Sequence, residues 1–224
     1  INDLFKEIAD IQTSDMLNLP IPKENSRVIS AEASDIQKEM INALAERAKK
    51  VRDGVVEPNE DNMLKIINEG RKIALDQRIV NNLLPHSENS KVSLCVNEIF
   101  NTWKNSTDKK STQLVFCDLS TPKAVEFNVY ADIKQKLINK GVPENEIAFI
   151  HDANNSSQKK ILFSKVRCGD VRILMGSTSK MGAGTNVQDL IIASHDLDCP
   201  WRPRDLEQRK GRSIRQGNKN ETVD

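Results

Sequence analysis

The sequence has few of the features that mark several large classes of protein. Its 224 residues include only six Phe, two Trp and one Tyr, so we expect a core of mainly aliphatic side chains, as is common where helices cover a parallel sheet. The 33 Lys and Arg nearly balance the 32 Asp and Glu, which argues against a uniformly basic or acidic protein. With 38% hydrophobic and 29% charged residues, the chain is expected to be globular.

Cysteine and long apolar runs are also scarce. The four Cys have no CxxC spacing and do not pair with the three His at intervals typical of metal ligands, so we expect neither a metal site nor disulfides. No apolar run reaches the length of a membrane span, and the first ten residues lack a basic and then apolar signal pattern. These absences favour a cytoplasmic protein without membrane contact.

The pattern of apolar residues divides the chain into three parts. Residues 1–30 include two prolines that interrupt a helix and are expected to form a connector from an upstream lobe. Residues 31–110 are expected to be helical, with Ser34 capping the first helix and Gln37 completing its capping box. Residues 111–224 are expected to form an α/β lobe that is truncated at its end.

Short apolar strands alternate with helical patterns in this last part. Two βαβ units in succession predict parallel strands, and hence an α/β fold in which helices flank a parallel sheet. The strands are expected at 113–119, 147–150, 171–175 and 190–197. The helices are expected at about 34–54, 61–78, 90–103, 130–140 and 156–168.

The strongest local signal is a basic segment at residues 200–219, which contains seven Lys or Arg and two acidic residues. Asp205 is expected to cap a helix that ends at Gly217. Three side chains would then share one face of the helix: Gln208, Arg212 and Arg215. Arginine offers a planar, permanently charged group that suits phosphate oxygens. The face therefore predicts a polyphosphate site, although a charge run by itself is more often a solvated helix.

Two further signals follow expected strands. Residues 176–188 form a glycine-rich turn directly after a strand, where α/β sheets commonly bind ligands through free backbone N–H groups. The turn is not a Walker A motif, because Lys180 precedes its paired glycines. Ser120 and Thr121 follow the first strand at the same sheet edge, where hydroxyls bind phosphates or, more often, cap the next helix.

Histidines at strand ends invite a catalytic interpretation that the other residues do not support. His151 is followed by Asp152, and His195 by Asp196 and Asp198. No Ser or Cys stands in a nucleophile elbow, and no HExxH motif or carboxylate pair has suitable spacing. We therefore expect both histidines to be structural.

The order of these segments resembles the second RecA-like lobe of superfamily-two helicases, and among them the SNF-type DNA translocases. That family reads broadly as Ser-Thr-Lys-x-Gly-Gly-x-Gly-x-Asn, Asp-x-x-Trp-Asn-Pro and Gln-x-x-x-Arg-x-x-Arg-x-Gly-Gln. The first motif matches Thr178, Ser179, Lys180, Gly182, Gly184 and Asn186. The second matches Asp198, Trp201 and Pro203, and the third matches Gln208, Arg212, Arg215 and Gly217.

The resemblance covers most of the chain and has defined departures. Arg202 stands where the family has the Asn of Trp-Asn-Pro, Asn218 stands for the last Gln, and the glycine loop is one residue shorter beside Met181. Within the family, the sequence is similar to the large helicase proteins of phages and conjugative elements. Those proteins often carry a fused adenine-specific DNA methyltransferase.

This resemblance implies a lobe that completes an ATP site shared with an N-terminal lobe of the same polypeptide, and that contacts DNA. The sequence has neither a GxxxxGK[ST] motif nor an Asp-Glu pair after a strand, so the other lobe would hold most of the ATP and Mg²⁺. Arg212 and Arg215 would reach the γ-phosphate, and Gln208 would position the nucleotide or the attacking water. The nucleotide would also be contacted by Gly182, Gly184 and Asn186. DNA phosphates would be contacted by Ser120, Thr121, Thr178 and Lys180.

Two other functions remain open from the residues alone. One is a nonenzymatic α/β module that binds nucleic acid or a partner through its basic helix. The other is a Rossmann-like transferase that uses residues 182–186 for a nucleotide cofactor. Against the latter, no acidic residue closes a second strand at the usual distance from that turn, and the glycines come late in the sheet.

Overall fold

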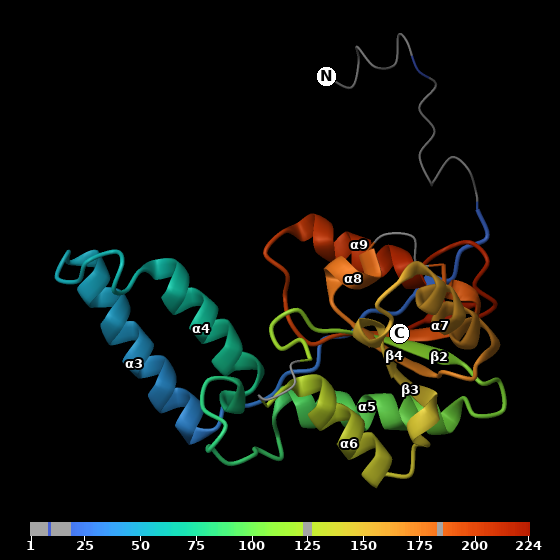
Figure 1. Cartoon of the computed structure of the whole chain (residues 1–224), viewed down its shortest axis with the longest axis horizontal. Helices are drawn as coiled ribbons and strands as arrows, with labels where there is room; N and C mark the ends of the chain where they lie inside the picture. The colour runs from blue at the N-terminus through green and yellow to red at the C-terminus, as the bar shows by residue number, and fades with distance from the viewer. Residues whose placement is uncertain (1–8, 10–18, 123–126, 183–185) are drawn as a thin grey trace.

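The computed structural model describes residue 9 and residues 19–122, 127–182 and 186–224. Four parallel strands form its central sheet: β2 (Thr112–Phe116), β3 (Ile147–Phe149), β4 (Ile173–Gly176) and β5 (Ile191–Asp196). Their order is β3-β4-β2-β5. One face is covered by α5 (Lys91–Asn105) and α6 (Val129–Asn139), and the other by α7 (Ser156–Cys168), α8 (Thr178–Gly182) and α9 (Pro203–Ser213) (Figure 1). The expected α/β fold with parallel strands is confirmed.

The two faces of the sheet hold separate apolar clusters. Successive residues of a strand point to opposite faces, and β2 shows this because Leu114 and Phe116 belong to one cluster while Val115 belongs to the other. All five residues of β2 are buried, as expected for a strand with neighbours on both sides. Burial of β2 on both faces explains why Leu114, Val115 and Phe116 follow one another without polar alternation.

Helix α5 packs on the sheet, although its residues precede the expected domain boundary at 110. Val92, Val96 and Ile99 on α5 are at most 2% exposed and belong to the cluster that contains Val115. Across the boundary, the buried Arg172 donates hydrogen bonds to the carbonyl oxygen of Trp103 at 2.6 Å and to the hydroxyl of Ser106 at 3.0 Å. The boundary itself stays a prediction, but the segments on its two sides share one core.

The other two α-helices between residues 31 and 110, α3 (Asp35–Arg52) and α4 (Met63–Leu75), form a hairpin that projects away from the sheet (Figure 1). Ser34 and Gln37 form the expected capping box at the start of α3. A small cluster of Leu44, Ile66 and Ile73 joins the two helices. At the end of α4, Leu75 is buried in the apolar cluster that contains Val115. Arg71 on α4 also contacts the sheet domain, since its Nη2 donates to the carbonyl oxygen of Cys199 at 2.5 Å and its guanidinium lies 4.6 Å from the centre of the Trp201 ring.

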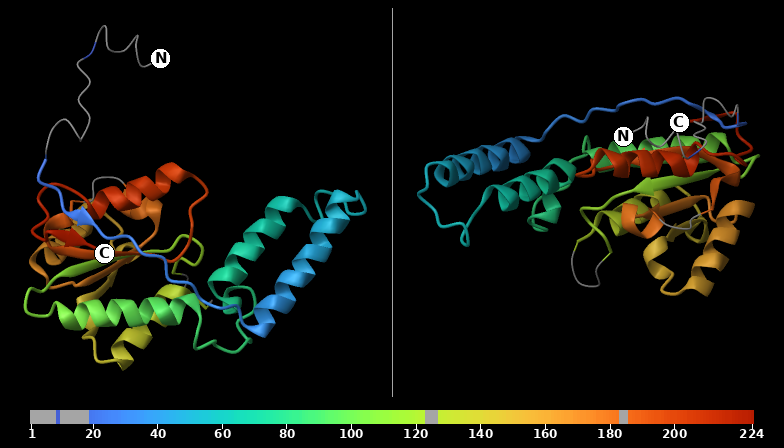
Figure 2. Two further views of the ribbon diagram at one scale, coloured as in Figure 1. Left: turned by 180° about the vertical axis from the view of Figure 1, so that it is seen from behind. Right: turned by 90° about the horizontal axis from the view of Figure 1, so that it is seen from above.

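The segment before α3 runs beside the edge of the sheet (Figure 2). Within it, β1 (Lys23–Glu24) pairs in parallel with β6 (Thr222–Val223). Asp224 follows β6 and joins it to β5, since its N–H donates to Ile192 and its carbonyl oxygen accepts from Ser194. This stretch, expected as a connector, is therefore hydrogen-bonded at the β5 edge. None of the helices in the described ranges is both long enough and apolar enough to cross a membrane.

A pH dependence of stability follows from His195 on β5. Its Nε2 lies 2.9 Å from Oε1 of Gln113, and burial, followed by the charge of Arg27, lowers the pKa of His195 to about 4. Since the unfolded chain binds this proton near pH 6.5, the folded state binds fewer protons than the unfolded state between these values, and stability falls as pH falls, by up to about 1.4 kcal/mol per pH unit. We expect His195→Gln to lose this contribution in urea unfolding measured from pH 7 to pH 4. A free-energy difference between the two proteins that stays constant over this range would contradict the assignment.

Candidate functional site

The carboxyl ends of β2 and β4 and the first half of α9 border an open cleft of about 550 Å³. It is lined by the hydroxyls of Thr121, Ser177, Thr178 and Ser179, the carboxylates of Asp118 and Asp205, and the amide of Gln208. Three side chains that the sequence analysis assigned to ligand contact, Thr121, Thr178 and Gln208, thus meet in one cleft although they are far apart in the sequence. A cleft rich in hydroxyl groups and accessible to solvent suits a polar ligand.

A buried arginine holds this edge of the sheet together. The side chain of Arg209 on α9 is 0% exposed. Its Nε donates to Oγ1 of Thr178 at 2.8 Å. Its two other nitrogens donate to three aspartates at the ends of strands: Asp118 after β2, Asp196 at the end of β5, and Asp198 after β5. These bonds reach Asp196 Oδ1 at 3.0 Å, the Asp198 carbonyl oxygen at 2.8 Å, Asp198 Oδ1 at 2.8 Å and Asp118 Oδ2 at 2.8 Å. Because a guanidinium has five N–H donors, the five bonds use its whole capacity. We call Arg209, Thr178 and these three aspartates the Arg209 cluster.

The Arg209 cluster also fixes the backbone around it. Oδ2 of Asp198 accepts the N–H of Asp118 at 2.5 Å and that of Leu119 at 2.8 Å. Asp118 in turn accepts the N–H of Thr178 at 2.7 Å and its hydroxyl at 2.7 Å. One side chain from α9 thus links the segments that follow β2, β4 and β5, because each of these segments contributes an acceptor to the cluster.

The cluster contains three carboxylates and one guanidinium, and the pKa values follow from this imbalance. Burial acts to lower the pKa of Arg209, but the hydrogen bond and charge of Asp198, and then those of Asp196, raise it above its ordinary value. Burial raises the pKa of Asp196, while its bond to Arg209 works in the opposite direction. The guanidinium therefore stays charged and neutralises part of a dense group of negative charge.

The role of Arg209 does not follow from the sequence patterns described above. The basic composition of residues 200–219 gives Arg209 only one charge among seven, and Asp196 and Asp198 stand beside a histidine without a catalytic motif. A signal was present, because Asp118 and Asp198 come just after strands that end at the same edge of the sheet, and such a group of carboxylates needs a buried cation. The expectation that His195 is structural agrees with its contact to Gln113.

Helix α9 begins earlier and ends sooner than predicted. Its first residue is Pro203, whose fixed backbone angle suits the first helical position, and Asp205 lies in the first turn instead of capping it. The helix ends at Ser213, so Arg215 lies beyond it. The prediction that Arg215 shares a helical face with Gln208 and Arg212 is therefore wrong. The two buried residues of α9 are Arg209 and Ser213, so its contact with the sheet is largely polar.

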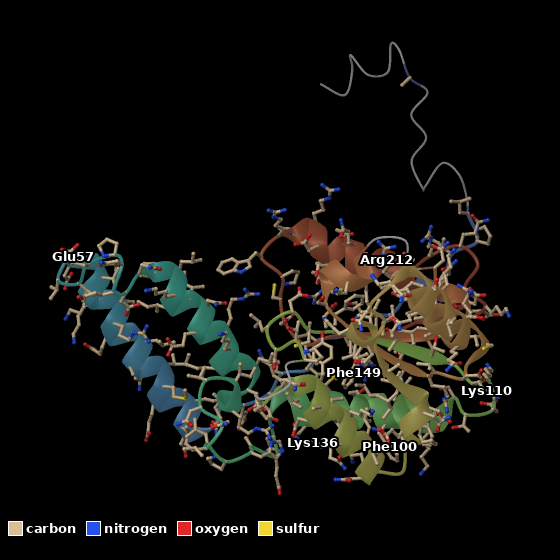
Figure 3. All side chains as sticks on the ribbon, in the orientation of Figure 1. Glu57, Phe100, Lys110, Lys136, Phe149 and Arg212 are labelled. Carbon is tan, nitrogen blue, oxygen red and sulfur yellow. The ribbon has the colours of Figure 1, made fainter. Side chains whose placement is uncertain are left out.

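Arg212 and Arg215 nevertheless lie close enough to interact through their charges, and Arg215 contacts Asn186 near the end of the glycine-rich turn. Arg212 is half-buried, and its Nε is buried without a hydrogen-bond partner. Burial, followed by the charge of Arg215, lowers the pKa of Arg212. Arg215 donates from Nη1 to Oδ1 of Asn186 at 3.0 Å, and within the described residues neither arginine forms an ion pair with a carboxylate. In Figure 3, Arg212 lies on α9, across the sheet from Phe100 on α5 and Lys136 on α6.

The remaining predicted site residues have different surroundings. Ser120 is buried, and its Oγ accepts the N–H of Val129 at the start of α6, which is the capping role that the sequence left open. The hydroxyl of Thr178 is occupied within the Arg209 cluster. Lys180 is exposed on α8 and Gly182 is the last residue of that helix, whereas Gly184 lies outside the described residues.

One group of side chains has the composition of a metal site but is already filled by cations. Ligand atoms of Asp76, His86 and Asp132 lie within 4.8 Å of one another. Nη2 of Arg78 lies 2.7 Å from Asp76 and 2.9 Å from Asp132, and Nζ of Lys136 lies 2.5 Å from Asp132. These two side chains neutralise the carboxylates, so in the part of the chain that the structure describes this group does not suit a divalent ion.

One family model and one solved structure match most of the sheet domain. The model of the helicase conserved C-terminal domain family matches residues 90–217, from the start of α5 to the turn after α9. The crystal structure of the C-terminal part of the Fun30 ATPase domain is similar with a TM-score of 0.59 at 15% identity, over 92% of this chain and 84% of that one. This similarity shows a RecA-like fold. No curated protein matches the sequence significantly.

Two larger helicase structures show weaker similarity. The DUF1998 helicase MrfA bound to DNA matches 57% of this chain with a TM-score of 0.41 and 14% identity. The helicase domain of Pyrococcus furiosus Hef matches 84% of this chain with a TM-score of 0.39 and 13% identity. The matched part is 17% of the MrfA chain and 35% of the Hef chain, so this chain spans a small part of either protein.

Replacement of Arg209 tests the energetic importance of the Arg209 cluster. Arg209→Met keeps most of the side-chain volume but leaves three carboxylates without their common cation. We expect a loss of about 3 to 5 kcal/mol in the free energy of unfolding, measured by urea denaturation. Arg204→Met is the matched control, because Arg204 is exposed on the same helix and forms no ion pair within the described residues, and it should change stability by about 0.5 kcal/mol or less. Equal effects of the two substitutions would contradict this account.

Proposed function

The chain belongs to the helicase conserved C-terminal domain family, and from that membership we propose that it is the second lobe of an ATP-dependent DNA translocase. In this proposal it completes an ATP site that is held mainly by an N-terminal lobe of the same polypeptide. The family membership establishes a helicase-type C-terminal lobe. Beyond this, we propose that the lobe contacts ATP and DNA and that it works with an N-terminal lobe.

The observation that supports it best is the state of Arg212. A half-buried guanidinium with a buried, unpartnered Nε and a neighbouring positive charge is unfavourable in the lobe by itself, because burial of charge without compensation is costly. An anion that approaches this place would remove that cost. A γ-phosphate has the required charge, and its equatorial oxygens gain negative charge as the phosphoryl group is transferred. Arg212 would then act as an arginine finger, with Arg215 beside it.

Gln208 and Asn186 are the polar groups best placed to orient the nucleotide. Gln208 lies on α9 one turn before Arg212 and lines the cleft. Asn186 receives a hydrogen bond from Arg215 and so holds that guanidinium near the end of the glycine-rich turn. In the proposal, Gln208 positions the nucleotide or the attacking water, while Asn186 positions Arg215. Gly182 and Gly184 stay assigned to nucleotide contact.

The proposed DNA contacts involve the phosphate backbone and not the bases. Thr121 lines the cleft and Lys180 is exposed on α8, which borders it, so both side chains are available to phosphate oxygens. Such contacts carry no sequence information, and binding is therefore expected to be independent of sequence. The hydroxyls of Ser120 and Thr178 have partners within the protein, so these residues would support the backbone under the DNA-contacting surface.

Within the residues that the structure describes, the carboxylate groups discussed above do not suit Mg²⁺. The aspartates of the Arg209 cluster bind a guanidinium, and Asp76 and Asp132 bind Arg78 and Lys136. We therefore assign Mg²⁺, which would neutralise charge on the phosphates of ATP, to the N-terminal lobe and derive no step through it here.

The assignment of the chain to a branch of the superfamily-two helicases is also part of the proposal. The sequence motifs favour the SNF-type branch and the large cytoplasmic helicase proteins of phages and conjugative elements, with a fused adenine methyltransferase as an additional partner. An upstream reading frame that encodes a Walker A lysine and an acidic pair after a strand would support the two-lobe arrangement. An upstream frame without them would contradict it.

Arg212→Ala tests the arginine finger. In a polypeptide that contains both lobes, we expect the rate of ATP hydrolysis to fall by about 10³ to 10⁵, because the charge that develops on the phosphate loses its partner. Affinity for DNA, measured by fluorescence anisotropy of a labelled oligonucleotide, should be retained. Arg204→Ala is the matched control on the same helix. The alternative of a nonenzymatic binding module predicts the reverse, a loss of DNA affinity without an effect on hydrolysis.

The lobe alone provides a second test. We expect the purified 224-residue chain to release no phosphate from ATP above background, with or without DNA, because it lacks a Walker A motif. The measurement is a phosphate-release assay at saturating ATP. DNA-stimulated release that disappears in Arg212→Ala would show a complete active site within this chain and would overturn the proposal.

A further inference from the structure

We propose that Arg209 is a positioning residue that couples the DNA-facing start of α8 to the nucleotide-facing Arg212, so that stimulation of ATP hydrolysis by DNA depends on it. This inference rests on the proposed function and adds a residue that neither the sequence motifs nor the family match assign. It also gives Thr178 a defined part, as the partner through which Arg209 holds α8.

Arg209 does not itself contact a ligand. Its side chain is 0% exposed and its five N–H donors are all used by partners within the protein. A group without solvent contact and without a free donor is available neither to ATP nor to DNA. Any effect of Arg209 on hydrolysis must therefore act through the residues that it holds.

The residues that Arg209 holds lie on two helices, α9, which is proposed to contact ATP, and α8, which is proposed to contact DNA. Arg209 follows Gln208 directly and precedes Arg212 by three positions on α9, so its anchoring fixes the rotation and position of the helix that presents both side chains. Nε of Arg209 binds the hydroxyl of Thr178, the first residue of α8, and Lys180 lies on the same short helix. The hydrogen bond of Arg209 thus connects the helix that presents Arg212 to the helix that presents Lys180.

Thr178 is the part of this connection that can be removed with the least change. Its hydroxyl donates to Asp118 Oδ2 at 2.7 Å and accepts from Arg209 Nε at 2.8 Å. Valine has nearly the same shape but lacks the hydroxyl, so Thr178→Val removes the direct hydrogen bond between α8 and Arg209 and leaves the other four bonds of Arg209 in place. Its N–H still bonds to Asp118.

The chain offers a matched control for this substitution. Thr112 on β2 is also buried, and its Oγ1 has no hydrogen-bond partner within the described residues. Thr112→Val therefore makes the same chemical change without breaking a link. Loss of an unpaired buried hydroxyl is expected to leave stability unchanged or to raise it.

The experiment compares wild type, Thr178→Val, Arg209→Lys and Thr112→Val in the polypeptide that contains both lobes. The readout is the ratio of the DNA-stimulated to the basal rate of ATP hydrolysis, together with the DNA concentration that gives half-maximal stimulation. We expect the ratio to fall about fivefold or more in Thr178→Val and Arg209→Lys, while the half-maximal concentration changes less than about threefold. Thr112→Val should match wild type.

The ratio distinguishes coupling from a merely structural role. A variant that is partly unfolded loses basal and stimulated activity by the same factor, so its ratio is unchanged. An unchanged ratio in both Thr178→Val and Arg209→Lys would overturn the inference, and if Arg212→Ala still abolished hydrolysis, the proposed function would stand without it. If Arg212→Ala hydrolysed ATP at the wild-type rate, the proposed function would fail and the coupling role with it.

Discussion

The charge pairing between Arg209 and three aspartates is the interaction on which the carboxyl edge of the sheet depends. Strands β2 and β5 each deliver carboxylates to the same place, and without a cation these groups would repel one another in a partly buried setting. Arg209 resolves the conflict and also makes α9, which buries little apolar surface of its own, part of the domain. The position of every proposed ligand contact on α8 and α9 follows from that pairing.

The hairpin of α3 and α4 depends on the sheet domain in a different way. Its own core is small, and Arg71 connects it to the segment before α9 through the Cys199 carbonyl oxygen and the Trp201 ring. These contacts are local and partly exposed, whereas α5 is held by fully buried apolar residues and by Arg172. The helices that precede the sheet in the sequence therefore differ in how they are attached, since α5 packs along the core, whereas the hairpin enters that core only with Leu75, the last residue of α4.

The sequence was informative where local patterns decide the structure. Apolar runs bounded by polar turns predicted the parallel strands, and Ser34 with Gln37 predicted a helix start, because both depend on neighbouring residues. It was uninformative where distant charges decide. The burial of Arg209 depends on the carboxylates of Asp118, Asp196 and Asp198. The end of α9 at Ser213 places Arg215 outside the helix, where it binds Asn186. Helical spacing alone predicts neither, since periodicity describes a helix only as far as it extends.

The contrast between Arg209 and Arg212 is the strongest structural argument for a shared active site. The two side chains lie one turn apart on α9 and have the same chemistry, yet Arg209 has five acceptors and Arg212 has a buried nitrogen with none. A lobe that is optimised only for its own stability would not bring an unpaired guanidinium close to a second one. The arrangement is consistent if the missing acceptor belongs to a ligand held by another lobe, because the cost is then recovered only when the two lobes close around it. In that case both arginines serve the same function. The fully bonded Arg209 fixes the position of the helix, and Arg212 keeps a charged group on that helix without a partner until the ligand binds.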